Sequence, residues 1–144
     1  MKTDVIKLER ISRGRLMSLI KWLGKGIVFQ QIDSETKQNI GLNIVRPDES
    51  FKGIDLSDYP VKGGVSRLYI DYPVRDPVYA IINNAGDLYD LIVEIRKVLI
   101  AIIDNYEEFN VSRYIKLGNL YIKKLEILKD GDIVVYINNI CNYE

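Results

Sequence analysis

Few side chains in this sequence have the types and spacing that enzyme chemistry needs. The 144-residue chain contains no histidine and one cysteine, Cys141. Histidine acid–base catalysis, Ser-His and Cys-His nucleophile pairs, histidine metal sites and thiolate zinc clusters are therefore excluded. The sequence also has no glycine-rich phosphate-binding motif of the GxxxxGK[ST] or GxGxxG type. We expect no catalytic residue, no metal and no cofactor, and interpret Cys141 as a packing residue without a base to activate it.

Carboxylates are the remaining catalytic groups. The stretch "DSETK" places Asp33 and Glu35 near Lys37, in loose similarity to the cluster of a metal-dependent nuclease. The three residues fall in a predicted hairpin turn, where water weakens any shift in pKa, so a solvated turn is the favoured interpretation. Paired carboxylates of the kind that cleave glycosides stay open, because their pairing is spatial.

A basic segment, "RISRGRLMSLIKWLGKG" over residues 10–26, carries the single tryptophan. It predicts a helix from about Arg13 to Gly24, with Ser12 as the N-cap and the Gly24-Lys25-Gly26 run as the stop. Its apolar stripe consists of Leu16, Leu19, Ile20 and Leu23. Trp22 lies about 120° from the centre of that stripe, so it is not an obvious member of the helix's core face.

Four interpretations compete for this segment. The first is a core helix with a solvated basic face. The second is a protein-binding surface centred on Trp22, although burial of Trp22 is favoured because a wholly exposed tryptophan is uncommon. The third is binding of nucleic-acid phosphates, and the last is docking to a membrane. The phosphate-binding candidates are Arg10, Arg13, Arg15, Lys21 and Lys25.

Charge and composition restrict the class of protein. The chain has 20 basic and 20 acidic side chains, so no net field draws it to nucleic acid or membrane. A single cysteine fits a reducing compartment, and the first residues do not resemble a signal peptide, so we expect a cytoplasmic location. Ile, Lys, Asn and Tyr are abundant and have AT-rich codons, which is compatible with a low-GC bacterium, an archaeon, a virus or a mobile element as the source.

The N-terminal half predicts a hairpin and a lone strand. Residues 27–32 and 39–45 flank a polar connection and predict the hairpin. Residues 66–72 alternate, which predicts a strand with Leu68, Ile70 and Tyr72 facing inward and Tyr69 exposed on the polar face. Residues 77–83 fit either a short helical turn after Asp76-Pro77 or a strand.

The C-terminal half predicts a long helix followed by a hairpin. A helical stripe extends from Leu88 to about Glu108, and Val93 and Ile100 lie outside it. We therefore expect the first helix or a second copy of the chain, as in a homodimer, to cover that flank. Residues 120–128 and 133–139 predict a hairpin around Asp130-Gly131, with a β-bulge at Lys123-Lys124 where the alternation slips.

A long connection, residues 46–64, has no regular period yet carries apolar side chains. Loops of this length are often functional, and tyrosine and tryptophan supply much of the energy of protein interfaces. The candidates for binding a partner are accordingly Trp22, Phe51, Ile54, Leu56, Tyr59 and Tyr69.

Together these elements predict one globular domain over residues 1–144 of the α+β class. We expect an antiparallel sheet of about five strands, built from two hairpins and a lone strand, with a long helix and a short N-terminal helix packed on it. The favoured function is a non-catalytic protein-binding module, such as an inhibitor, an immunity-type protein or a phage or viral regulatory protein. The alternative is nucleic-acid binding through the basic helix, and a carboxylate-dependent enzyme ranks third.

Overall fold

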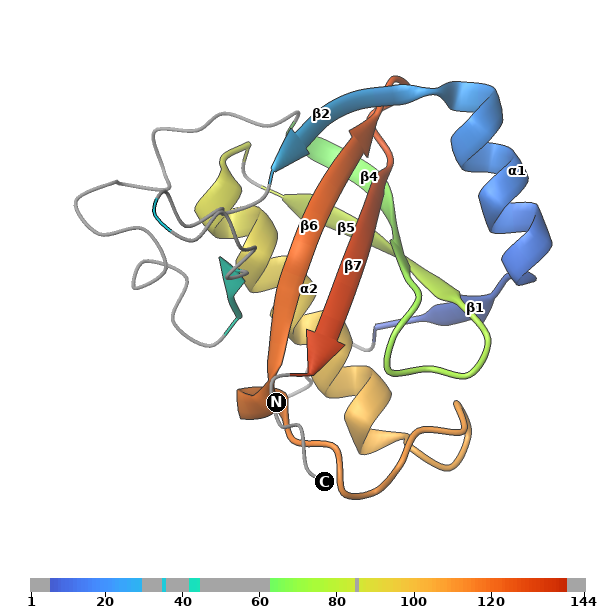
Figure 1. The fold of residues 1–144 in the computed structure, drawn as a ribbon, viewed down its shortest axis with the longest axis vertical. Helices are drawn as coiled ribbons and strands as arrows, with labels where there is room; N and C mark the ends of the chain where they lie inside the picture. Colours follow the sequence, from blue (N-terminus) through green and yellow to red (C-terminus); the bar gives the residue numbers. More distant parts are fainter. Residues whose placement is uncertain (1–5, 30–34, 36–41, 45–62, 85, 140–144) are drawn as a thin grey trace.

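The computed structural model describes residues 6–29, 35, 42–44, 63–84 and 86–139 (Figure 1). Within them the chain forms two α-helices and one short 3₁₀ helix, namely α1 (Arg13–Leu23), α2 (Leu88–Asp104) and η3 (Leu117–Asn119). It also forms seven strands, which are β1 (Leu8–Arg10), β2 (Lys25–Phe29), β3 (Leu42–Asn43), β4 (Gly64–Ile70), β5 (Val78–Asn84), β6 (Leu120–Leu128) and β7 (Ile133–Asn139).

All seven described strands belong to one sheet of order β1-β5-β4-β7-β6-β2, with β3 paired to β6. The α+β class is confirmed. The expectation of a purely antiparallel sheet is wrong, because β4 and β7 pair in parallel at the centre, with Tyr69 opposite Val134. The strand interpretation of residues 77–83 is correct, since β5 pairs along its whole length with β4.

The parallel pair follows from the way two hairpins are joined. Strands β4 and β5 form one antiparallel hairpin, and β6 and β7 form the other. Helix α2 connects β5 to β6, two strands that run in the same direction, and a connection between strands of the same direction needs a crossover rather than a tight turn. The crossover places β4 and β7 side by side, and both strands are rich in buried aliphatic residues.

The main core lies between α2 and one face of the sheet. In Figure 1, α2 passes behind β6 and β7, so this face points away from the viewer. The side chain of Asp87 caps the helix by accepting a hydrogen bond from the backbone nitrogen of Asp90 at 2.8 Å. The buried residues of α2 recur at helical spacing and are Leu88, Leu91, Ile92, Ile95, Val98, Leu99 and Ile102. The stripe expected from the sequence contains all of these residues except Val98, and it also included Ile103 and Tyr106, which are only partly buried.

Helix α2 ends four residues earlier than expected. The backbone nitrogen of Asn105 donates to the carbonyl oxygens of Ala101 and Ile102 at 3.2 Å each, and its side chain donates to the same Ala101 oxygen at 2.8 Å, so Asn105 closes the last turn of the helix. The chain then turns through Asn110, which has a φ of 56°. This turn brings Phe109 and Val111 into the core, so apolar residues beyond Asp104 are buried without continuing the helix.

The expected N-terminal hairpin is wrong. Strands β2 and β3 both pair antiparallel with β6. Strand β2 pairs with the second half of β6, and β3 pairs with the first half of β6. Two strands that are each antiparallel to β6 run in the same direction, so they cannot form a hairpin with each other. By contrast, the C-terminal hairpin is confirmed, and the register of β6 against β7 shifts between Ile122 and Lys124, where the bulge was predicted.

A second, smaller core lies on the opposite face of the sheet, beneath α1. Its buried members are Ile11, Leu16, Tyr69, Leu128 and Val134. The expectation that Tyr69 is exposed is wrong, because α1 covers the end of β4 that carries it. At the other end of the same face Val65 is exposed, so alternation along β4 alone did not indicate which part is covered.

Because α1 and α2 pack on opposite faces, the first helix does not cover the flank of α2. Ile100 is 42% exposed. The part of the prediction that placed the first helix on this flank is therefore wrong, and cover by a second copy of the chain stays a prediction.

Ile95 and Ile100 provide a matched test of the main core. Ile95 is fully buried, so we expect Ile95→Ala to lower the free energy of unfolding by about 2–5 kcal/mol. Ile100→Ala, the same change on the same helix, should cost less than about 1 kcal/mol if the isolated chain is monomeric. Urea denaturation of both variants measures the difference, and equal losses would contradict the assignment of the buried face.

Candidate functional site

Helix α1 forms where the sequence predicted it. The backbone nitrogen of Arg15 donates to Ser12 Oγ at 3.1 Å, which caps the first turn. Gly24 ends the helix with a φ of 75°, a conformation that favours glycine. A Cβ on Gly26 would lie 2.3 Å from the carbonyl oxygen of Ile127, so glycine is required for β2 to pair closely with β6. The helix is therefore defined at both ends by local sequence.

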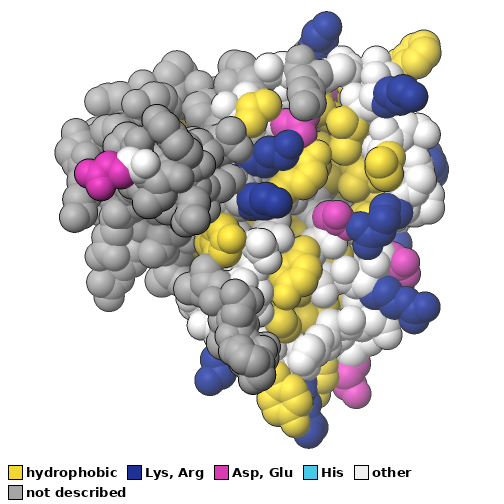
Figure 2. All heavy atoms as spheres, in the orientation of Figure 1, with side chains coloured by type: hydrophobic (Ala, Val, Ile, Leu, Met, Phe, Trp, Pro, Cys, Tyr) yellow, Lys and Arg dark blue, Asp and Glu magenta, His cyan; other side chains and the backbone are white. Residues whose placement is uncertain are grey.

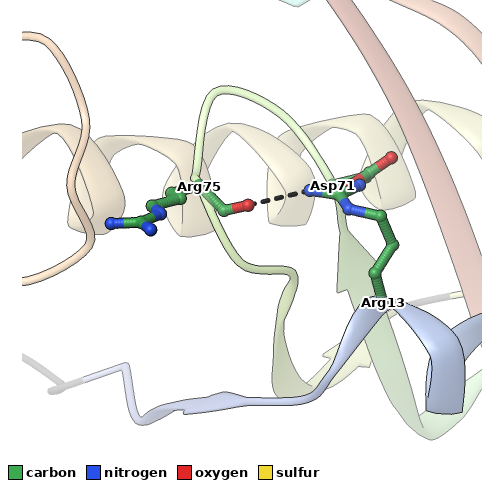
Figure 3. A network of polar contacts seen from close by, with 3 residues as sticks. All are labelled: Arg13, Asp71 and Arg75. Atoms are coloured by element: carbon green, nitrogen blue, oxygen red, sulfur yellow. Dashed lines mark hydrogen bonds and ion pairs between the residues drawn. The ribbon is translucent and has the colours of Figure 1, made fainter.

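Two arginines attach the segment around the start of α1 to the rest of the protein. Arg13 forms an ion pair with Asp71 and donates to the carbonyl oxygen of Arg75 at 2.8 Å (Figure 3). Arg10 donates to the carbonyl oxygen of Glu108 and lies over the ring of Phe109, 5.4 Å from its centroid. Both guanidinium groups are thus engaged with the connections that follow β4 and α2.

The four phosphate-binding candidates whose side chains the structure describes do not form one patch. Arg10 and Arg13 make the contacts just described. Arg15 and Lys21 are both exposed, but six residues separate them, which places them about 120° apart around α1. The backbone of Lys25 begins β2, and its side chain is outside what the structure describes.

Trp22 is 86% exposed, so the expectation that favoured its burial is wrong. The cause is geometric. Leu16 and its stripe face the sheet, and Trp22 lies on the flank of α1 where no described residue covers it. Met17, on the other flank, is 65% exposed. Five residues separate the two, which places them about 140° apart around the helix.

A groove lies between α1 and the sheet, on the side of Met17. We call it the α1 groove, a cavity of about 620 Å³ lined by Arg13, Leu16, Met17, Ser18, Ile20, Lys21, Asp71, Val134 and Tyr136. Its volume is within the range of about 300–1,000 Å³ that is typical of ligand sites. Figure 2 shows this face of the molecule, where hydrophobic side chains gather in the middle and Lys and Arg side chains lie among them.

The floor of the groove is linked to a buried carboxylate. Tyr136 donates its hydroxyl hydrogen to Glu126 Oε1 at 2.8 Å. Glu126 is 1% exposed, its second oxygen has no hydrogen-bond partner among the described residues, and Lys124 Nζ lies 3.8 Å from Oε1. Burial, followed by the hydrogen bond to Glu126, raises the pKa of Tyr136 well above its ordinary value. The phenol therefore stays neutral at physiological pH.

Sequence reasoning did not identify Glu126 or Tyr136 as site residues. Alternation after the bulge in β6 places Glu126 on the face opposite Leu125 and Ile127, and alternation alone does not indicate whether that face is covered. Only the positions of β7 and α1 determine that this part of the face is buried. Asp71 was missed for the same reason, because its partner Arg13 is 58 residues away in the sequence.

Other predicted site residues are partly beyond what the structure describes. Phe51, Ile54, Leu56 and Tyr59, together with Asp33, Lys37 and Cys141, lie outside the described residues, and Glu35 is exposed. Within the described ranges, no group of three or more Asp, Glu, His or Cys side chains is placed to hold a metal ion. In the same ranges, neither helix combines the length and apolar character needed to cross a membrane.

Comparison with known proteins does not assign the groove, since no protein-family model, curated protein sequence or solved structure matches the chain. Its chemistry is therefore inferred from its own geometry. An apolar lining with cations at the rim and a neutral phenol on the floor is suited to binding.

The hydrogen bond between Tyr136 and Glu126 predicts a specific pH dependence of stability. Because the pKa of Tyr136 is raised in the folded state, its contribution is fully present below about pH 10, the ordinary tyrosine pKa, and is lost as the pH rises further. We expect Tyr136→Phe to lower stability at pH 7 by about 1–3 kcal/mol and to make the loss above pH 10 shallower.

Urea denaturation between pH 7 and 11 checks this prediction. Tyr114→Phe is the matched control, because Tyr114 is 74% exposed and should behave as the unmodified protein does. An unchanged alkaline slope in Tyr136→Phe would rule out the proposed linkage.

Proposed function

We propose that this protein is a non-catalytic protein-binding module and that α1 is its docking helix. The kinds of protein that fit are an inhibitor, an immunity-type protein or a phage or viral regulatory protein. The observation that carries the proposal is the 86% exposure of Trp22. Tryptophan is among the residue types most enriched in the side chains that dominate binding energy, and a partner that covered Trp22 would remove a large apolar surface from water.

The arrangement of α1 supports the same function. Trp22 and Met17 are exposed on opposite flanks of the helix, so a partner that covers the outer half of α1 would contact both. Methionine suits such a surface because its flexible thioether adapts to different partners. The two ends of α1 are held by Ser12, Gly24 and the Arg13–Asp71 pair, so little of the helix would have to become ordered on binding.

The nucleic-acid alternative has less support. Two of its five candidate cations, Arg10 and Arg13, are engaged within the chain. Arg15 and Lys21 point in different directions around α1, whereas phosphate binding needs several cations along one surface. Membrane docking has the same weakness, because a flat bilayer needs the apolar residues on one face and Met17 and Trp22 are on opposite flanks.

A photo-crosslinking residue at position 22 tests the proposal in cells that naturally make the protein. We expect a discrete adduct that excess unmodified protein competes away. The same residue at position 114 is the control, because Tyr114 is also an exposed aromatic side chain but lies outside α1.

The purified partner then allows a quantitative test. Trp22→Ala should weaken binding by about 2 kcal/mol or more and change the free energy of unfolding by less than about 0.5 kcal/mol. Calorimetry and urea denaturation measure the two quantities separately. Equal affinity of Trp22→Ala and the unmodified protein for the partner would show that α1 is not the docking helix.

A further inference from the structure

The α1 groove has a buried apolar floor and a more exposed wall. Leu16 and Val134 are buried on its floor, and Met17 stands at its rim with most of its surface in water. An apolar side chain that entered the groove would be removed from water together with part of Met17. Burial of apolar area is the main favourable contribution to such binding. The groove therefore favours an occupant with an apolar part.

The charges at the rim determine the sign of the occupant. Helix α1 contains basic residues and no acidic residue. Asp71 is the one acidic residue that lines the groove among those described, and it is paired with Arg13. Lys21 has no ion pair among the described residues. Its charge is therefore left to attract an anion at the rim.

The floor adds no charge that would oppose this. The hydroxyl of Tyr136 donates to Glu126, and Tyr136 stays neutral. The ammonium group of Lys124 lies 3.8 Å from Glu126 Oε1 and 4.7 Å from the centroid of the Tyr136 ring, so the charge of the buried carboxylate is balanced locally. An anionic group is thus favoured at the rim beside Lys21, and an apolar group is favoured below it.

We propose that the α1 groove seats an acidic segment of the partner protein, with an apolar side chain between Leu16 and Val134 and a carboxylate on Lys21. This inference rests on the proposed function and names the chemistry of the partner. Charge complementarity at a rim contributes more to specificity than to affinity, while the buried apolar side chain supplies most of the binding energy.

A synthetic peptide of alternating glutamate and leucine residues is the probe, and the same peptide with lysine in place of glutamate is its control. Backbone amide shifts of the full chain are followed by NMR at about 0.1 M salt, where rim charges are only partly screened. We expect saturable shifts at Met17, Lys21 and Val134 with the acidic peptide, weaker binding as salt is raised, and no saturable shifts with the basic peptide.

Two substitutions at the rim test the two parts of the site. Lys21→Glu should weaken binding of the acidic peptide by about fivefold or more, because it replaces an attraction with a repulsion. Lys116→Glu makes the same charge change before η3, away from α1, and should alter binding by less than about twofold (Figure 1). Met17→Ser tests the apolar wall and should also weaken binding. All three residues are exposed, so unchanged unfolding midpoints confirm that the variants fold.

Several outcomes would overturn the inference. Equal binding of the acidic and basic peptides, or equal effects of Lys21→Glu and Lys116→Glu, would show that Lys21 does not select the charge. Shifts confined to residues around Trp22 would place the peptide outside the groove and leave the proposed function intact. Tighter binding of duplex DNA than of the acidic peptide, or self-association lost in Lys21→Glu, would identify a different occupant. Failure of the crosslinking at position 22 would instead count against the proposed function.

Discussion

The burial of the apolar stripe of α2 against the sheet is the contact on which the rest of the structure depends. Seven residues of this helix are buried, and each aliphatic side chain removed from water contributes about 1.5–3 kcal/mol. Because α2 connects β5 to β6, its docking also determines how the two hairpins meet. Strand β4 comes to lie beside β7, and the parallel pair at the centre of the sheet is a consequence.

The two faces of the sheet therefore differ in how completely a helix covers them. The α2 face is covered by a long helix with a continuous apolar stripe. The α1 face is covered by a shorter helix that contacts the sheet through a few side chains around Leu16, Tyr69 and Val134. Incomplete cover leaves the α1 groove, exposes Trp22 and places Met17 at a rim. The larger buried core lies on the α2 face, and the surface that we propose for a partner lies on the α1 face.

Polar contacts complete the α1 face and have distinct roles. The Arg13–Asp71 pair is exposed, so its contribution to stability is small, and it orients the start of α1 relative to β4. Glu126 is buried, and Tyr136 and Lys124 compensate part of the cost of burying its charge. The first contact joins the start of α1 to the connection after β4, and the second keeps the floor of the groove neutral.

The sequence by itself determined what depends on local periodicity and caps: α1 from Ser12 to Gly24, the buried stripe of α2, the hairpin around Asp130-Gly131 and the bulge in β6. These features follow from neighbouring residues, which a single segment contains. Other features depend on which segments meet across the fold. They are the central parallel pair, the pairing of both β2 and β3 with β6, the burial of Tyr69 and Glu126, and the exposure of Trp22. Tertiary structure alone decided them, because the same alternation or stripe is compatible with either a covered or an open face until the partner element is placed.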